Sequence, residues 1–140
     1  MLEHTHAIII IKNDKDEYLQ YYDNRWNCFL FPNCKLSNDN HIKQINDYLS
    51  SIFSLNIQEN QINYIMDKVH EKFSESAGKI KLYHHYFYKV ESCAINNKED
   101  NFFNAKDHIA SWFSLNKLEN DERIQKVNSD IVQFVKEIKL

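Results

Sequence analysis

The stretch from Phe29 to Leu55 constrains the fold more than any other part of the sequence. An apolar run leads into a turn at Pro32-Asn33-Cys34, then a polar segment, then apolar residues at helical spacing. Residues three, four and seven positions apart share one face of a helix. The members of this face are Ile42, Ile45, Leu49, Ile52 and Phe53. We therefore predict a strand, a tight loop and a helix over about residues 39–54, with Asn38 or Asp39 as its N-cap.

Hydrophobic patterns predict the other elements. The β-branched run at residues 6–12 is expected to be a central strand buried on both faces. Glu17–Tyr22 is expected to pair back on it as a hairpin. Further strands are expected near residues 61–72, 79–90 and 109–113, and a final helix near residues 121–139. The order β-β-β-α-β-β-β-α predicts an α/β (α+β) fold, a mixed β-sheet sandwiched between helices, in a single domain over residues 1–140.

Residues 79–90 show the clearest strand pattern, and they should form a long hairpin with residues 61–72. One face carries Ile80, Leu82, His84, Tyr86, Tyr88 and Val90, and the other carries Lys79, Lys81, Tyr83, His85, Phe87 and Lys89. Because His84 and His85 are neighbours on a strand, they point to opposite faces and cannot chelate one metal ion. His84 could meet His70 if the register pairs them, and His4 and His6 share a face, but no third ligand can be assigned. We predict no metal site.

The segment from residue 26 to residue 55 resembles the signature of the Nudix family. That signature runs from a Trp and a Leu-Pro-Gly-Gly turn, through an acidic loop, into a helix with an Arg-Glu pair and a Glu-Glu pair. Trp26, Phe31 and Pro32 match its beginning, whereas Asn33 and Cys34 replace the two glycines. The resemblance implies a Nudix fold over nearly the whole chain.

A second resemblance lies at Ser111–Leu118, which is similar to the Trp strand and Leu-containing turn that lead into the last helix of Nudix proteins. It implies that Trp112 belongs to the core. We therefore expect Trp112 and the apolar stripe of the last helix to be structural.

The alignment with the Nudix signature implies that the catalytic carboxylates are absent. Asp47 falls on the family's Arg, Tyr48 on its first Glu, and Ser51 and Ile52 on its Glu-Glu pair. In the family those glutamates hold the Mg²⁺ that activates water, a role that needs hard oxygen ligands. We therefore expect no catalytic residue and no cofactor.

A divergent Nudix hydrolase of a nucleoside-diphosphate derivative is the alternative, and only this alternative would need Mg²⁺. Such an enzyme would require a site rebuilt from acidic residues on other elements. The candidates are Glu71, Glu75, Glu91, Glu99 and Asp100.

The candidate ligand-binding residues are aromatic or basic. Aromatic faces stack on nucleotide bases, and the planar fork of an Arg suits a phosphate. The candidates are Arg25, Trp26, Phe31, Tyr86 and Tyr88. A bound nucleotide should place its base against Trp26 or a tyrosine of residues 79–90, with its phosphates toward Arg25 and the N-terminus of the first helix.

Composition narrows the setting of the protein. A net charge of −3 gives no case for a nucleic-acid patch. The apolar run Ala7–Ile11 is too short to span a membrane and follows no basic leader, so we expect a cytoplasmic protein. We predict a catalytically inactive Nudix-like module, a pseudoenzyme, that binds a nucleotide or a protein partner. A further alternative is an accessory domain in a nucleotide-signalling or defence system, and the oligomeric state is left open.

Overall fold

The computed structural model describes residues 3–37, 39–55, 57–75, 77–91, 102–105 and 108–138. Asn38, Glu99 and Asp100, which figure in the predictions above, lie outside the described residues. The first half contains β1 (Glu3–Ile11), β2 (Glu17–Asp23), β3 (Cys28–Leu30), β4 (Asn33–Lys35) and α1 (His41–Phe53). The second half contains the 3₁₀ turn η1 (Glu59–Gln61), β5 (Ile62–Ser74), β6 (Lys79–Val90), β7 (Phe102–Ala105), β8 (His108–Ser114), α2 (Leu115–Asn120) and α3 (Glu122–Ile138).

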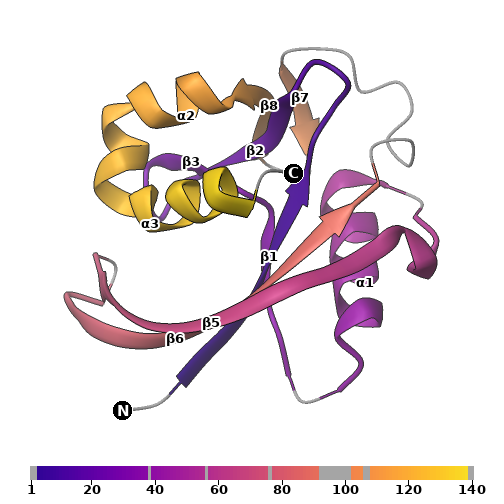
Figure 1. Ribbon diagram of the computed structural model, residues 1–140, viewed down its shortest axis with the longest axis horizontal. Helices are drawn as coiled ribbons and strands as arrows, with labels where there is room; N and C mark the ends of the chain where they lie inside the picture. Colours follow the sequence, from indigo (N-terminus) through magenta and orange to yellow (C-terminus); the bar gives the residue numbers. More distant parts are fainter. Residues whose placement is uncertain are drawn as a thin grey trace.

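Two four-stranded sheets form the centre of the molecule. The first is mixed, in the order β4-β1-β6-β5, with β1 parallel to β6. The second is antiparallel, in the order β3-β2-β8-β7. Figure 1 shows α1 on one side of the mixed sheet, with α3 and the antiparallel sheet on the other. The mixed α/β architecture predicted from the sequence is confirmed, although the strands divide between two sheets.

The expected hairpin between β1 and β2 is wrong. The two strands share only one isolated bridge, between Lys12 and Tyr18, and then diverge into different sheets. The reason is that both edges of β1 are already paired, one with β4 and the other with β6. A strand has only two edges for hydrogen bonding, so β2 pairs with β3 and β8 instead.

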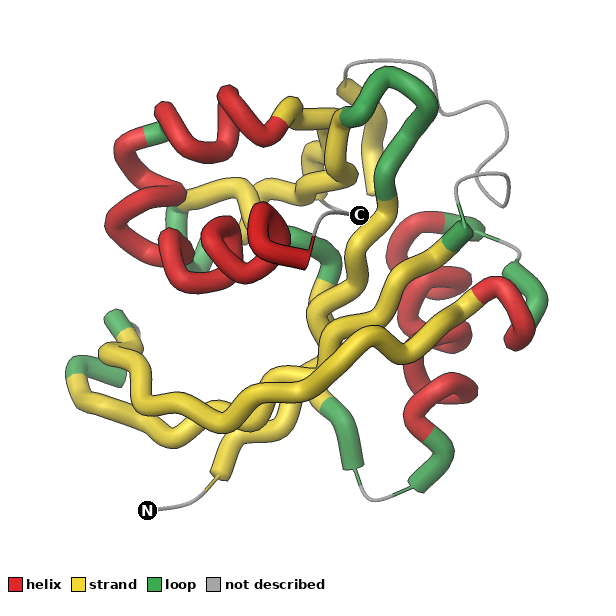
Figure 2. Tube along the Cα trace, in the orientation of Figure 1, coloured by secondary structure: helices red, strands yellow, loops and turns green. Residues whose placement is uncertain are grey.

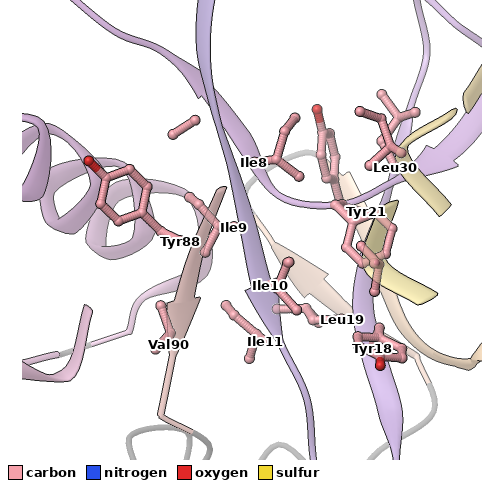
Figure 3. Packing of buried hydrophobic residues seen from close by; sticks show 14 of the residues in the cluster. Ile8, Ile9, Ile10, Ile11, Tyr18, Leu19, Tyr21, Leu30, Tyr88 and Val90 are labelled. Atoms are coloured by element: carbon pink, nitrogen blue, oxygen red, sulfur yellow. The ribbon is translucent and has the colours of Figure 1, made fainter. Parts of the chain in front are cut away.

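Alternate residues of β1 supply the core on both sides of the mixed sheet. Figure 3 shows Ile9 and Ile11 beside Tyr88 and Val90 on one side of the strand. On the other side, Ile8 and Ile10 lie toward Leu19, Tyr21 and Leu30 of the second sheet. All of these residues are buried, which is why the run shows no polar alternation.

The predicted long hairpin of β5 and β6 is confirmed, and β6 has the expected bounds. Its antiparallel register runs from Ile62 opposite Val90 to Ser74 opposite Lys79, with one bulge between Tyr64 and Met66. Figure 2 shows the far half of this hairpin running below α2 and α3. Gly78 closes the turn with a φ of 65°, a conformation that glycine adopts without strain.

The N-cap predicted for the first helix needs correction, whereas the bounds predicted for the last helix are confirmed within a residue or two. The N-cap of α1 is Asn40, whose side chain accepts a hydrogen bond from the backbone N–H of Lys43, whereas Asp39 contacts Ser37. The final helix predicted near residues 121–139 is confirmed as α3, and Asp121 caps it by accepting a hydrogen bond from the N–H of Ile124. The short helix α2 before it was not predicted. Within α3, Asn128 leaves the helical conformation and makes a kink.

Asn33 and Cys34, which the resemblance aligns with the signature's glycines, adopt ordinary strand geometry. Both residues lie in β4, opposite Ile8 and Ala7 of β1, and neither has a positive φ. The chain at this point is therefore extended and does not need glycine.

Among the described residues, no helix is long and apolar enough to cross a membrane.

Candidate functional site

A cavity of about 280 Å³ lies on the face of the mixed sheet that looks toward α3. Its walls come from β1, the β2–β3 loop, β4, the far half of the β5–β6 hairpin and the middle of α3. Elements from both halves of the sequence therefore build one enclosure. The hairpin and α3, which form opposite walls, can be followed in Figure 1.

The charge of the cavity lining is entirely positive. Four cationic side chains line it, Arg25, Lys35, Lys72 and Lys81, and no Asp or Glu does. Within the described part of the chain, no ion pair joins Arg25, Lys35 or Lys81 to a carboxylate. Because the protein as a whole carries a formal charge of −3, this concentration of cations is local. It favours an anionic ligand.

Lys72 is held in place by α3. Its ammonium group donates to the side-chain oxygen of Asn128 and to Asp130, both at 2.9 Å. The kink at Asn128 brings this side chain into the cavity wall, where the residue is buried. The contact fixes the distance between α3 and β5, so it also sets the width of the cavity.

Trp26 and Phe31 also line the cavity. Phe31 is buried, and its ring meets Tyr18 edge to face. The carbonyl of Trp26 accepts two hydrogen bonds from Arg123 of α3, at 3.1 Å and 2.6 Å. Arg123 also pairs with Glu75 at the end of β5. The loop that carries Arg25 and Trp26 is thus tied to α3 and to the hairpin.

Three histidines line the cavity, and two of them are substantially buried. Burial lowers the pKa of His85 to about 3, with His70, Lys72 and His6 lowering it further, while Asp130 opposes the shift. Burial also lowers the pKa of His6, whose Nδ1 has no hydrogen-bond partner among the described residues. His4, the third, lies nearer the strand end, with its ring 5.6 Å from that of Tyr83. At neutral pH the buried rings of His6 and His85 are therefore neutral.

The five residues proposed from the sequence do not share one site. Arg25, Trp26 and Phe31 line the cavity, whereas Tyr86 and Tyr88 do not. Tyr86 lies on the opposite face of β6, where its ring meets that of His41 at the start of α1. The residues of β6 that line the cavity are Lys81, Tyr83 and His85. Strand alternation separates the two sets, but the sequence alone does not show which face looks toward α3.

The N-terminus of α1 is also not part of the cavity, because no residue of α1 lines it. A ligand in this cavity therefore could not bring its phosphates to both Arg25 and this helix end, as the predicted pose requires. The contact of His41 with Tyr86 places the helix end across the mixed sheet from the cavity. Any phosphate in the cavity would instead meet lysine and arginine side chains.

The residues of α1 do not fit the Mg²⁺ that the fold family implies. Asp47 is exposed and pairs with Lys43 at 3.0 Å, and Tyr48 has no carboxylate that could bind a metal ion. Among the described residues, no group of three or more His, Cys, Asp or Glu side chains is arranged to hold a metal ion. Mg²⁺ prefers several oxygen ligands in an octahedral arrangement, which this helix does not supply.

The histidine pairing differs from the one considered from the sequence. His70 lies opposite Tyr83 and bonds diagonally to His85, with 2.8 Å between Nε2 and Nδ1. His84 points to the other face and contacts Asp67 at 2.6 Å. The opposite orientation of His84 and His85 is as predicted, but the partner of His70 is His85.

Sequence reasoning missed the lysines and Asn128 as lining residues. The signal for Lys81 was present, because the sequence already grouped Lys81, Tyr83 and His85 on one face of residues 79–90. Asn128 gives no such signal, since it interrupts an apolar helical stripe that otherwise continues regularly.

Comparisons with known proteins identify the architecture. No protein-family model matches the sequence, and no curated protein matches it at a significant level. Solved structures do match. A Nudix hydrolase from Nitrosomonas europaea superposes with a TM-score of 0.61 at 15% identity, covering 99% of this chain and 88% of the other. A MutT protein from Methanosarcina mazei Go1 gives 0.64 at 13% identity, with coverages of 98% and 93%.

A third match has a ligand named with it. It is a bifunctional NMN adenylyltransferase/ADP-ribose pyrophosphatase from Francisella tularensis, complexed with AMP and a manganese ion. The TM-score is 0.61 at 15% identity, covering 98% of this chain and 42% of that protein. These matches define the class of the fold. The chain has the fold of the Nudix hydrolases, and identities this low establish the fold alone.

Proposed function

We propose that this protein is a Nudix-fold binding module that accepts a small anionic ligand, a nucleotide or its phosphorylated fragment, without metal-dependent hydrolysis. The observation that carries the proposal is the cavity, which has four cationic side chains and no carboxylate in its lining. Trp26 and Tyr83 add aromatic surface to the same enclosure. A base can stack on such surface while the cations neutralise its phosphate.

The proposal of an inactive module rests on the chemistry of the ligand set. Of the acidic residues that a relocated catalytic site would use, the three that the structure describes, Glu71, Glu75 and Glu91, do not line the cavity. Glu75 is paired with Arg123, and Glu91 accepts a hydrogen bond from Asn63. These contacts leave the Mg²⁺-dependent alternative without a carboxylate cluster among the described residues.

Isothermal titration against a panel of nucleoside mono-, di- and triphosphates tests the proposal, and AMP is the first probe because it accompanies a protein of the same fold. We expect micromolar or weaker binding that EDTA leaves unchanged. Phosphate release assays with Mg²⁺ and Mn²⁺ should show no turnover. Binding that strictly requires a divalent ion, or turnover of any nucleotide, would restore the hydrolase alternative.

A protein partner is the second candidate ligand, favoured by apolar side chains on the face of the hairpin that looks away from α3. Val69, Phe73 and Ile80 are each more than half exposed there, and Phe73 lies opposite Ile80. Sedimentation of the wild type and of Phe73→Ser over a range of concentrations tests whether that partner is a second copy of this chain, and a wild type that stays monomeric throughout contradicts self-association.

A further inference from the structure

A chain of three polar side chains runs through the wall of the cavity. Nδ1 of His85 lies 2.8 Å from Nε2 of His70, and Nδ1 of His70 lies 3.4 Å from a carboxylate oxygen of Asp130. An ionised carboxylate is only a hydrogen-bond acceptor, so Nδ1 of His70 must be the nitrogen that carries the hydrogen. Its Nε2 then accepts from Nδ1–H of His85, and Nε2 of His85 is left with a bare lone pair.

The ring that carries this lone pair forms part of the cavity wall. His85 is one of the lining residues and is only 6% exposed. No described residue makes a hydrogen bond to its Nε2. The ring is therefore held by its other nitrogen, with one acceptor atom available to whatever occupies the cavity.

This acceptor conflicts with the charge around it. The four cations of the lining attract an anion, but a phosphate oxygen and an imidazole lone pair repel each other when they meet. One proton between the two atoms turns the repulsion into a charge-assisted hydrogen bond. We propose that the cavity binds a small phosphate-bearing anion together with one proton, and that Nε2 of His85 receives that proton. The inference rests on the proposed function, because it requires an anion in the cavity.

The groups facing His85 explain why the proton arrives with the ligand and not before it. Charged or titratable side chains face this ring from every neighbouring element. They are His4 and His6 from β1, Arg25 from the β2–β3 loop, Lys35 from β4, His70 and Lys72 from β5, Lys81 and Tyr83 from β6, and Asp130 from α3. Burial lowers the pKa of His85, and His70, Lys72 and His6 lower it further, whereas Asp130 opposes the shift. A phosphate at the ring reverses the sign of the local field, and an opposite charge in contact raises a histidine pKa by about 1–3 units.

The chain to Asp130 stabilises the resulting imidazolium. It places the carboxylate of Asp130 one ring away from His85, with His70 between them, so the negative charge favours a positive charge at His85. His6 also has an unpaired nitrogen, but its ring lies only 6.4 Å from that of His85. Two positive rings at this separation repel each other, so one proton is expected for each ligand bound.

The size of the cavity narrows the ligand class. A volume of about 280 Å³ lies just below the range of about 300–1,000 Å³ for small-molecule sites. It suits one phosphate group with a sugar or base attached better than a dinucleotide. The ligand class is therefore a phosphate monoester of mononucleotide size or smaller.

Calorimetric titration with inorganic sulfate and with AMP tests the inference. Sulfate keeps its charge between about pH 8 and pH 5, so any pH dependence of its affinity comes from the protein. We expect sulfate to bind more tightly as the pH falls, with a slope approaching tenfold per pH unit. The binding heat near pH 5 should vary with the ionisation enthalpy of the buffer, corresponding to the uptake of a fraction of a proton that rises toward one as the pH falls further.

Variants on neighbouring residues of β6 separate this proton from other titrations. His85→Gln should bind sulfate without proton uptake and with little pH dependence. His84→Gln is the matched control, because His84 is the adjacent histidine but faces away from the cavity and contacts Asp67. It should keep the uptake of the wild type. If His85→Gln unfolds, Asp130→Asn interrupts the same chain and should reduce proton uptake at a given pH.

The outcomes distinguish the inference from the proposed function. Sulfate binding with no dependence on pH or buffer, or proton uptake on sulfate binding that persists in His85→Gln, overturns the inference and leaves the binding module intact. If neither sulfate nor any nucleotide binds at any pH, both proposals are wrong.

Discussion

The hydroxyl of Tyr48 accepts a hydrogen bond from the backbone N–H of Asn33, with 3.3 Å between the two heavy atoms. The bond joins the middle of α1 to β4. On the alignment with the Nudix signature, Tyr48 stands where a metal-binding glutamate is expected. A position that serves metal chemistry in that signature therefore has a structural contact in this protein.

Replacing Tyr48 by phenylalanine removes this hydrogen bond while keeping the ring. We expect the free energy of unfolding to fall by about 1–2 kcal/mol, because a partly buried donor loses its partner. Urea unfolding measures the change. Ser51→Ala, at an exposed position of the same helix, should change stability by less than about 0.5 kcal/mol. Equal effects of the two substitutions would show that the bond contributes nothing.

No divalent metal ion should bind α1, because its single carboxylate, Asp47, is exposed and paired with Lys43. Paramagnetic broadening of amide resonances by Mn²⁺ measures this directly. The amides of residues 41–53 should broaden no more than those of other exposed segments, and Asp47→Ala should not alter the pattern. Selective broadening around residue 47 that this substitution abolishes would refute the expectation.

Removing a cation from the cavity should weaken AMP binding. Arg25→Ala and Lys81→Ala are each expected to lower the affinity by about tenfold, since each removes a charge-assisted contact. Lys43→Ala is the control, because this lysine lies on α1, outside the cavity. Titration at two salt concentrations should show a smaller salt dependence in the first two variants. Unchanged affinity in both would place the site elsewhere.

Trp112 is only 5% exposed, as expected for the structural role predicted from the sequence. Trp112→Ala should cost about 3–5 kcal/mol, because it removes a large side chain and leaves a cavity. Thermal and chemical unfolding measure the loss. Trp26→Ala serves as the comparison, since Trp26 is partly exposed, and its cost should be clearly smaller. A loss below about 1 kcal/mol at Trp112 would contradict its place in the core.

Acidification should destabilise the protein through His85. The pKa of this ring is lowered to about 3, mainly by burial and further by His70, Lys72 and His6, whereas an unfolded chain has the ordinary value of about 6.5. Its stabilising contribution is complete above about pH 6.5 and is lost as the pH falls below that value, because the unfolded state then binds the proton first. Relative to His85→Gln, the wild type should lose about 1.4 kcal/mol per pH unit below pH 6. Parallel stability curves would disprove this.

The sequence predicted the elements better than their pairing. The strand over residues 79–90 was readable because its alternation is unbroken over its whole length, and β6 has the same bounds. The division of the strands into two sheets could not be predicted from the sequence, because it depends on which strands pair with the two edges of β1. Edge pairing is decided by contacts between distant parts of the chain, which periodicity does not record.

The same distinction applies to the candidate site. Arg25 and Trp26 stood out because a loop position leaves such side chains without an obvious packing role, and both line the cavity. Tyr86 was chosen over His85 although they are neighbours, since aromatic character was visible and the orientation of the face was not. Asn128 lines the cavity because the helix departs locally from helical geometry at this residue. No residue pattern predicts this departure.

The cavity joins the two ends of the described chain, from His4 on β1 to Ile131 on α3. During synthesis on a ribosome, β1 emerges first and α3 last, so most of the chain must be made before the enclosure exists. A ligand in the cavity therefore cannot guide early folding, but it can stabilise the folded protein once α3 has packed in place. Its presence would slow the detachment of α3, and protection from proteases should appear at that helix first.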